Sequence, residues 1–111
     1  MQLCYNAPMS EQLTLETFEP HVGSSFWAHT QTETGNHKIE LRLENAAKVM
    51  ESEAVRLERH PFSLYFLGPG SIYLEQKIYH FTHDAFPEGL DIFLVPIGKD
   101  ARGYLYEAAF A

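Results

Sequence analysis

The sequence predicts an all-β domain: a six- to seven-stranded antiparallel barrel or barrel-like sandwich with at most one short helix. Short runs rich in aromatic and β-branched residues recur along the chain, and turns containing glycine and proline separate them. Residues 38–44 alternate strictly between polar and apolar, which is typical of a strand with one buried face. The 111 residues suit one domain, so we expect a flexible N-terminal arm over 1–12 and a single β domain over 13–111.

The pattern of the N-terminal half predicts a hairpin. Residues 24–30 and 37–44 form its strands, and residues 34–36 (Thr-Gly-Asn) supply the turn, because glycine and asparagine accept positive φ at low cost. Three apolar residues of the second strand are expected to face the core: Ile39, Leu41 and Leu43. The preceding stretch, residues 13–18, fits either a first strand or a one-turn helix, since it is too short for its periodicity to decide.

Residues 45–60 are open to two interpretations. Apolar residues recur there at helical spacing, which predicts a short helix; they are Ala46, Met50, Ala54 and Leu57. The same segment could instead extend the strand to about Met50 and then form a loop. In either case it ends at His60, because a residue before proline avoids the helical conformation.

The C-terminal half predicts four strands, at residues 62–67, 75–82, 90–98 and 103–110. Residues 83–89 and 98–103 are expected to be loops. The run at 90–98 is the most apolar in the chain, and its one polar side chain is Asp91, so we expect a central strand covered on both faces. Proline cannot donate to a sheet, so we expect pairing through Val95 and a bend at Pro96.

The net charge of −7 argues against nucleic acid as a partner, because an acidic surface repels a phosphate backbone. Cys4 is the one cysteine, which excludes an intramolecular disulfide and a thiolate zinc site. Neither a signal peptide nor a transmembrane pattern is visible, so we expect a cytoplasmic protein without a membrane partner. No cofactor motif is recognisable, and no cofactor is expected.

A series of motifs resembles a family of small bacterial proteins known as a domain of unknown function; they are FSLYF (62–66), GP (68–69), Gln76, DIFLVPIG (91–98) and YEAAF (106–110). The resemblance covers roughly residues 12–110. It implies a compact, mostly β, single-domain protein and no set of catalytic residues. Some members lie near genes for tail-collar-like (microcystin-dependent) proteins, which implies a phage-tail-like or surface assembly.

Six histidines are many for this length, and His80, His83 and Asp84 are the candidate metal ligands. Positions three apart on a strand face opposite sides, so the two histidines converge only if the strand ends between them. The side chains of His80, Asp84 and Glu107 could also serve as acid–base groups, but Glu107 alternates with core residues and is expected to be solvated. We therefore predict no catalytic residues and lean against an enzyme.

Aromatic residues opposite the core are the candidate ligand-binding groups. If Phe66 and its alternating neighbours are core, then Tyr65 lies on the other face, and Trp27 lies opposite Phe26 in the same way. Together with Tyr73, these rings could stack on a sugar or contact a protein.

Three hypotheses for function follow. The first is a non-enzymatic structural or protein-interaction module that binds a protein partner, or a second copy as a homodimer, through an exposed strand edge or aromatic face. The second is a small-molecule or carbohydrate-binding barrel that uses Trp27, Tyr65 or Tyr73. The third, which the sequence favours least, is a metal-dependent enzyme around His80, His83 and Asp84.

Overall fold

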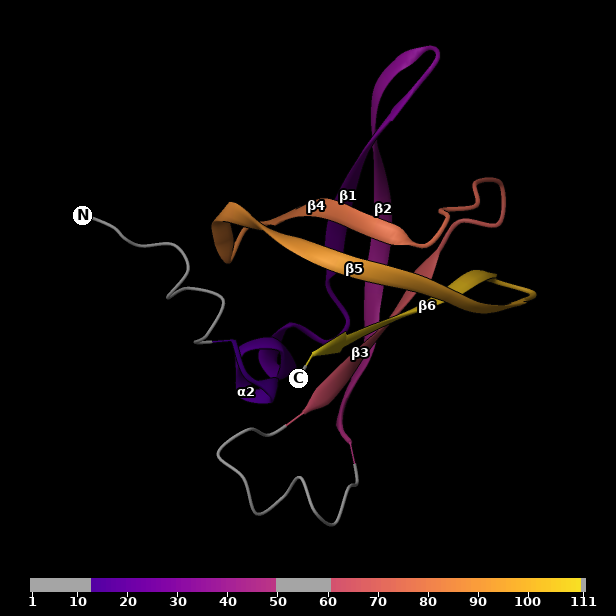
Figure 1. Ribbon diagram of the computed structural model, residues 1–111. Coiled ribbons are helices and arrows are strands. Elements are labelled where there is room, and N and C mark those ends of the chain that lie inside the picture. Colours follow the sequence, from indigo (N-terminus) through magenta and orange to yellow (C-terminus); the bar gives the residue numbers. More distant parts are fainter. Residues whose placement is uncertain (1–12, 50–60, 111) are drawn as a thin grey trace.

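The computed structural model describes residues 13–49 and 61–110. The elements are, in chain order, α2 (Leu15–Phe18), a 3₁₀ turn (Glu19–His21), β1 (Ser25–Thr32), β2 (Gly35–Lys48), β3 (Phe62–Gly68), β4 (Lys77–His83), β5 (Phe86–Asp100) and β6 (Gly103–Phe110). The six antiparallel strands close into a ring in the order β1-β2-β3-β6-β5-β4 (Figure 1). Over the described residues, this confirms the predicted all-β class with at most one short helix.

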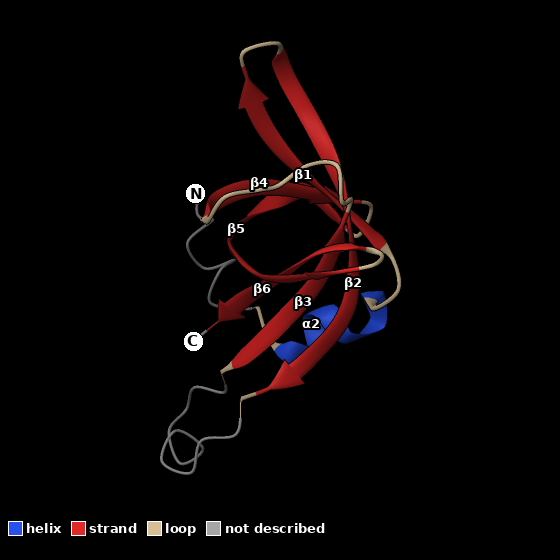
Figure 2. Ribbon diagram, turned by 90° about the vertical axis from the view of Figure 1, so that its right-hand side faces the viewer, coloured by secondary structure: helices blue, strands red, loops and turns tan. Residues whose placement is uncertain are grey.

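The ring is not an even barrel, because its strands pair over unequal lengths. β1 pairs with β2 along its whole length but meets β4 through residues 27–29. The two longest strands change partners: β2 passes from β1 to β3 at Arg42, and β5 passes from β4 to β6 after Leu94. As a result, the far end of the β1–β2 hairpin projects from the ring (Figures 1 and 2).

The predicted β1–β2 hairpin is confirmed, and β2 extends beyond the strictly alternating residues 38–44. Its last residues pair with β3, from Asn45↔Tyr65 to Lys48↔Phe62. Of the two interpretations of the segment after Glu44, the extended strand is therefore confirmed for residues 45–48 and the helix is wrong there, because sheet pairing outweighs a weak helix preference. Residues 50–60 and the expected arm, residues 1–12, lie outside the described part of the chain.

β5 differs from the prediction in its length and in whether both of its faces are covered. The expected loop at 83–89 is a turn at residues 84–85, and β5 already begins at Phe86. Val95 pairs with β6 and the register shifts just after Pro96, which confirms the expected irregularity at the proline. Leu90, Ile92 and Leu94 are buried, whereas Phe93 and Ile97 are exposed. The expectation that both faces are covered is therefore wrong within the described residues.

The core fills the ring, and one buried residue covers each end: Phe18 at one end and Leu74 at the other. Phe18, the buried residue of α2, packs its ring 5.6–6.0 Å from those of Phe62, Phe86 and Phe110. Figure 2 shows α2 beside β2 at the lower end of the ring. The remaining buried core residues are Phe26, Ala28, Ile39, Leu41, Leu43, Leu64, Phe66, Leu74, Tyr79, Phe81, Leu90, Ile92, Leu94, Tyr106 and Ala108.

The β3–β4 loop closes the other end of the ring. Leu74 is buried there, and its backbone N–H donates to the hydroxyl of Tyr106 at 3.0 Å. The loop approaches the β5–β6 turn so closely that a Cβ atom at Gly103 would lie 2.0 Å from the carbonyl oxygen of Gly68. Gly103 also has a φ of 152°, so glycine is required at this position. Among the described residues, no helix is long and apolar enough to cross a membrane.

Candidate functional site

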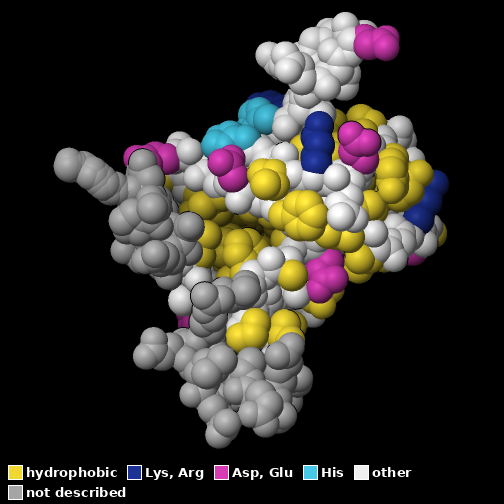
Figure 3. Space-filling model, viewed as in Figure 1, with side chains coloured by type: hydrophobic (Ala, Val, Ile, Leu, Met, Phe, Trp, Pro, Cys, Tyr) yellow, Lys and Arg dark blue, Asp and Glu magenta, His cyan; other side chains and the backbone are white. Residues whose placement is uncertain are grey.

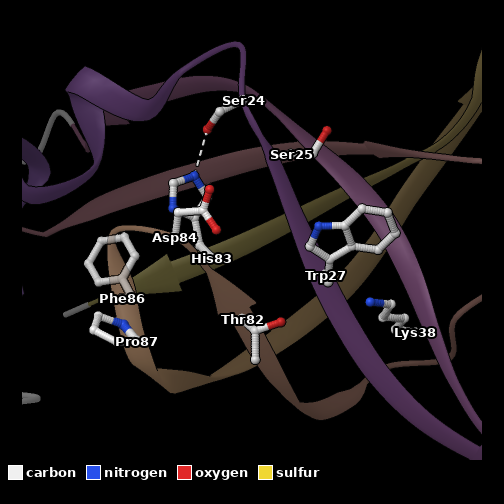
Figure 4. Close-up of a pocket in the computed structure, with 9 residues that line it drawn as sticks. All are labelled: Ser24, Ser25, Trp27, Lys38, Thr82, His83, Asp84, Phe86 and Pro87. Carbon is white, nitrogen blue, oxygen red and sulfur yellow. Dashed lines mark hydrogen bonds between the residues drawn. The ribbon is translucent and has the colours of Figure 1, made fainter.

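An open hollow of about 750 Å³ lies where β1 and β4 meet the β4–β5 turn (Figure 4). Of the predicted ligand-binding residues, Trp27 lines it. As predicted, Trp27 is opposite the buried Phe26, and its side chain is half-buried on the outer side of β1. The other residues that line the hollow are Ser24, Ser25, Lys38, Thr82, His83, Asp84, Phe86 and Pro87.

Charged residues of β2 surround the indole of Trp27. The Lys38 ammonium lies 5.1 Å from the centroid of the ring, a distance suited to a cation–π contact. Glu40 is the cross-strand partner of Trp27, and its carboxylate accepts a hydrogen bond from the hydroxyl of Ser25. One side of the hollow is therefore formed by an aromatic ring, a cation and a hydroxyl group, and the carboxylate of Glu40 lies next to them on β2.

His83 forms the inner wall of the hollow, and its hydrogen bonds fix its tautomer. Nδ1 accepts the backbone N–H of Ala85 at 3.0 Å, so this nitrogen carries no proton. In the neutral ring the proton is then on Nε2, which donates to Ser24 Oγ at 2.9 Å. The Ser24 hydroxyl in turn donates to the carbonyl oxygen of His21 at 2.7 Å.

The surroundings of His83 favour this neutral ring. Burial lowers the pKa of the His83 imidazole from its ordinary value of 6.5, the nearby His21 lowers this pKa further, and Asp84 opposes the shift. The ring packs on Phe26 with centroids 4.2 Å apart. A second proton on Nδ1 would face the N–H of Ala85 and break that hydrogen bond. Protonation of His83 therefore destabilises the folded state.

The Ser24–His83 contact does not have the arrangement of a catalytic dyad. In such a dyad the imidazole accepts the proton of the nucleophilic hydroxyl. Here the proton of Ser24 is given to a backbone carbonyl, and His83 acts as the donor to Ser24. The contact consequently secures the chain entering β1 against the end of β4, which is a structural task.

The structure does not bring together the predicted metal ligands. β4 continues through His83, so His80 faces the outer side while His83 faces Phe26. The Nδ1 atom of His80 lies 2.9 Å from Oδ1 of Asp91, and Asp84 is in the exposed turn. Within residues 13–49 and 61–110, no group of three or more His, Cys, Asp or Glu side chains is arranged to hold a metal ion.

Tyr65 and Tyr73, the other predicted ligand-binding residues, lie away from the hollow. Tyr65 is half-buried on β3, and its hydroxyl donates to the Glu107 carboxylate at 3.4 Å; Ser63 donates to the same oxygen at 2.8 Å. Glu107 faces away from the core as predicted, yet it is half-buried rather than fully solvated. Tyr73 is 57% exposed in the β3–β4 loop, with its ring 5.3 Å from that of Tyr104.

An exposed apolar ridge on β4 and β5 is a feature that the sequence did not predict. Ile78 and Phe93 are cross-strand partners, and their side chains are 63% and 47% exposed. Ile97, further along β5, is 51% exposed. We call these three residues the outer ridge. Figure 3 shows hydrophobic side chains gathered over this face, with histidine and carboxylate groups beside them. The signal in the sequence was the unbroken apolar run of β5, which has no polar alternate beyond Asp91.

Comparison with known proteins identifies a family and nothing more specific. The model of a family described as "Domain of unknown function (DUF6916)" matches residues 13–110. This agrees with the resemblance to a domain of unknown function over roughly residues 12–110, whereas the bacterial source and the genomic association with tail-collar-like proteins stay predictions. Neither the curated proteins nor the solved structures contain a significant match.

Proposed function

The chain belongs to the family DUF6916, and we propose that it is a non-enzymatic protein-interaction module that binds a protein partner through the outer ridge. The observation that carries this proposal is the exposure of Ile78, Phe93 and Ile97 on neighbouring strands. Single exposed apolar residues are common on proteins, but neighbouring ones on a sheet, such as the cross-strand pair Ile78 and Phe93, mark interaction sites. β-branched and aromatic side chains on a sheet lose little conformational entropy when they are covered.

Charge indicates what kind of partner suits the ridge. Asp91 precedes Phe93 by two residues on the same face, and Glu107 is the cross-strand partner of Val95. The whole chain carries a net charge of −7. A partner with apolar side chains flanked by lysine or arginine would match both the ridge and its acidic margin.

The same charges argue against a second copy as the occupant. A symmetric homodimer would bring the ridge of each copy, with its Asp91 and Glu107, against that of the other. The direction of the three side chains of the outer ridge bears on the mode of binding, because they project from the face of the sheet rather than lying along a strand edge. Docking against the face of β4 and β5 would cover them, whereas addition of a strand at an edge would leave them exposed.

Two further arguments support an interaction module. The proton arrangement at His83 makes Ser24 an unsuitable nucleophile, so the best-formed serine–histidine contact among the described residues offers no catalytic base. A small rigid domain with an apolar face also suits the tail-like or surface assembly that the family resemblance implies, in which each component docks on its neighbours.

Site-specific photo-crosslinking tests the proposal in the cells that make this protein. A photoreactive phenylalanine at position 93 is expected to capture one discrete protein with lysine or arginine beside the captured segment. The same group at Val22, which is 43% exposed in the segment between the 3₁₀ turn and β1, is the control and should not capture it. The variant Ile78→Thr should remove the cross-link, because threonine keeps the strand preference and deletes the apolar surface.

Sedimentation of the purified chain completes the test. A monomer at micromolar concentration, together with a cross-link that depends on Ile78, supports a heterologous partner. If position 93 captures only another copy of the chain and the purified protein sediments as a dimer, the proposed partner is wrong. An equal yield of cross-link from positions 93 and 22 would overturn the ridge as the binding surface.

A further inference from the structure

We propose that the hollow beside Trp27 binds one pyranose ring of a neutral saccharide, with the indole as its stacking surface. This site is separate from the outer ridge and does not rest on the protein-binding proposal. The volume of about 750 Å³ lies within the range of roughly 300–1,000 Å³ typical of small-molecule sites. An aromatic platform with a few polar side chains around it is the chemistry that holds a sugar, which has both apolar C–H faces and hydroxyl edges.

An exposed side chain, Lys38, lies over the face of the Trp27 indole where the sugar would stack. Its ammonium is 5.1 Å from the centroid of the ring. The electron-rich face of the indole attracts this cation, and the partly positive C–H groups of a pyranose meet the same face by the same electrostatics. Because lysine has a long flexible stem, Lys38 can turn aside and donate a hydrogen bond to a sugar hydroxyl.

The other side of the hollow provides the polar partners. In Figure 4, Asp84 lies across the hollow from Trp27, and Thr82 lies between them. A carboxylate accepts two hydrogen bonds at once, so Asp84 suits a pair of neighbouring hydroxyls. Phe86 and Pro87 extend the apolar wall on the side of Asp84. A ring stacked on Trp27 therefore finds acceptors at one edge and a donor, Lys38, at the other.

The balance of charge selects a neutral sugar over an acidic one. Asp84 lines the hollow, and Glu40 stands directly across from Trp27 on β2, against one cation, Lys38. His83 adds no positive charge, since burial lowers its pKa and keeps its ring neutral. The carboxylate of a uronic acid would meet two like charges for each opposite one.

Trp27 is the one tryptophan of the chain, so its fluorescence reports on this hollow directly. Titration with maltose, cellobiose and lactose should give a saturable change in emission for at least one of them, with half-saturation in the roughly millimolar range expected for a single stacked ring. Asp84→Asn, which loses one acceptor oxygen and the negative charge, and Thr82→Val, which loses its hydroxyl, keep the reporter and should each weaken binding by about fivefold or more. Glu75→Gln, on the distant β3–β4 loop, is the matched control and should bind as the parent does.

Thermal unfolding gives an independent measurement. The saccharide that binds should raise the Tm of the parent and leave that of Trp27→Phe unchanged beyond the general effect of sugars on proteins. Absence of a saturable change with all three sugars, or equal binding by Asp84→Asn and the parent, overturns the site. Tighter binding of glucuronic acid than of glucose overturns the choice of a neutral ligand.

Discussion

Replacement of Phe18 by alanine tests whether α2 covers one end of the core inside the ring. Phe18 has no exposed surface, and its ring contacts those of Phe62, Phe86 and Phe110 at 5.6–6.0 Å. Removing a buried phenylalanine loses its transfer free energy and leaves a cavity, which together cost about 3–5 kcal/mol. Since a domain of this size unfolds with about 5–15 kcal/mol, the variant should lose a large part of its stability.

Urea and thermal unfolding followed by far-UV circular dichroism measure this loss. The Tm of Phe18→Ala should fall by at least about 10 °C. Val22→Ala, just beyond the 3₁₀ turn and 43% exposed, is the control and should change the free energy of unfolding by less than about 1 kcal/mol. If the free energy of unfolding of Phe18→Ala also falls by less than about 1 kcal/mol, then α2 does not cover the end of the core and the packing described above is wrong.

Three further predictions concern the closed end of the ring and the inner wall of the hollow. Gly103→Ala should strongly destabilise the folded state or prevent folding, because its methyl group would clash with the carbonyl oxygen of Gly68 and the backbone there has a positive φ. Gly98→Ala is the control: a Cβ at Gly98 would meet nothing within 4 Å, so this variant should unfold at nearly the parental urea concentration. Tyr106→Phe should cost about 1–3 kcal/mol in urea unfolding, since the buried N–H of Leu74 loses its acceptor; an unchanged midpoint would disprove that bond. Because the pKa of His83 is lower in the folded protein, His83 takes up its proton at a higher pH in the unfolded chain than in the folded one. The neutral His83 therefore contributes to stability above its ordinary pKa of 6.5, and this contribution is lost as the pH falls below that value. The decline in unfolding free energy between pH 7.5 and 5.5 should be smaller in His83→Gln, and an identical decline in both proteins would contradict the assignment.

Much of the fold was predictable because its signals are local. The alternation of Ile39, Leu41 and Leu43 with polar residues identified a half-buried strand, and all three are buried. Pro96 predicted a bend in the strand because proline lacks the N–H that a ladder needs, and the register shifts just after it. The start of β5 was missed because Pro87 and Gly89 are typical of loops, and pairing with β4 overrides that local preference.

The candidate sites could not be predicted from short stretches of sequence, because they depend on which strands pair and in what register. Trp27 was correctly placed opposite Phe26, but its neighbours in the hollow come from β2 and the β4–β5 turn, which only the register of the sheet brings together. His80 pairs with Asp91 rather than with His83, since cross-strand neighbours, not sequence neighbours, share a face. Alternation along β5 places Phe93 on the same face as Asp91, but whether other elements cover that face depends on how the whole ring is arranged, which β5 alone cannot reveal.

The affinity of the cross-linked partner for variants of the outer ridge tests the central claim most directly. With purified proteins in isothermal titration calorimetry, the double variant Ile78→Thr, Phe93→Thr should bind at least about 30-fold more weakly than the parent, as expected for loss of anchor residues worth 2 kcal/mol or more. Val22→Thr, which changes an exposed apolar residue outside the ridge, should bind as the parent does. If the double variant is folded and binds within about twofold of the parent, the outer ridge is not the interaction surface.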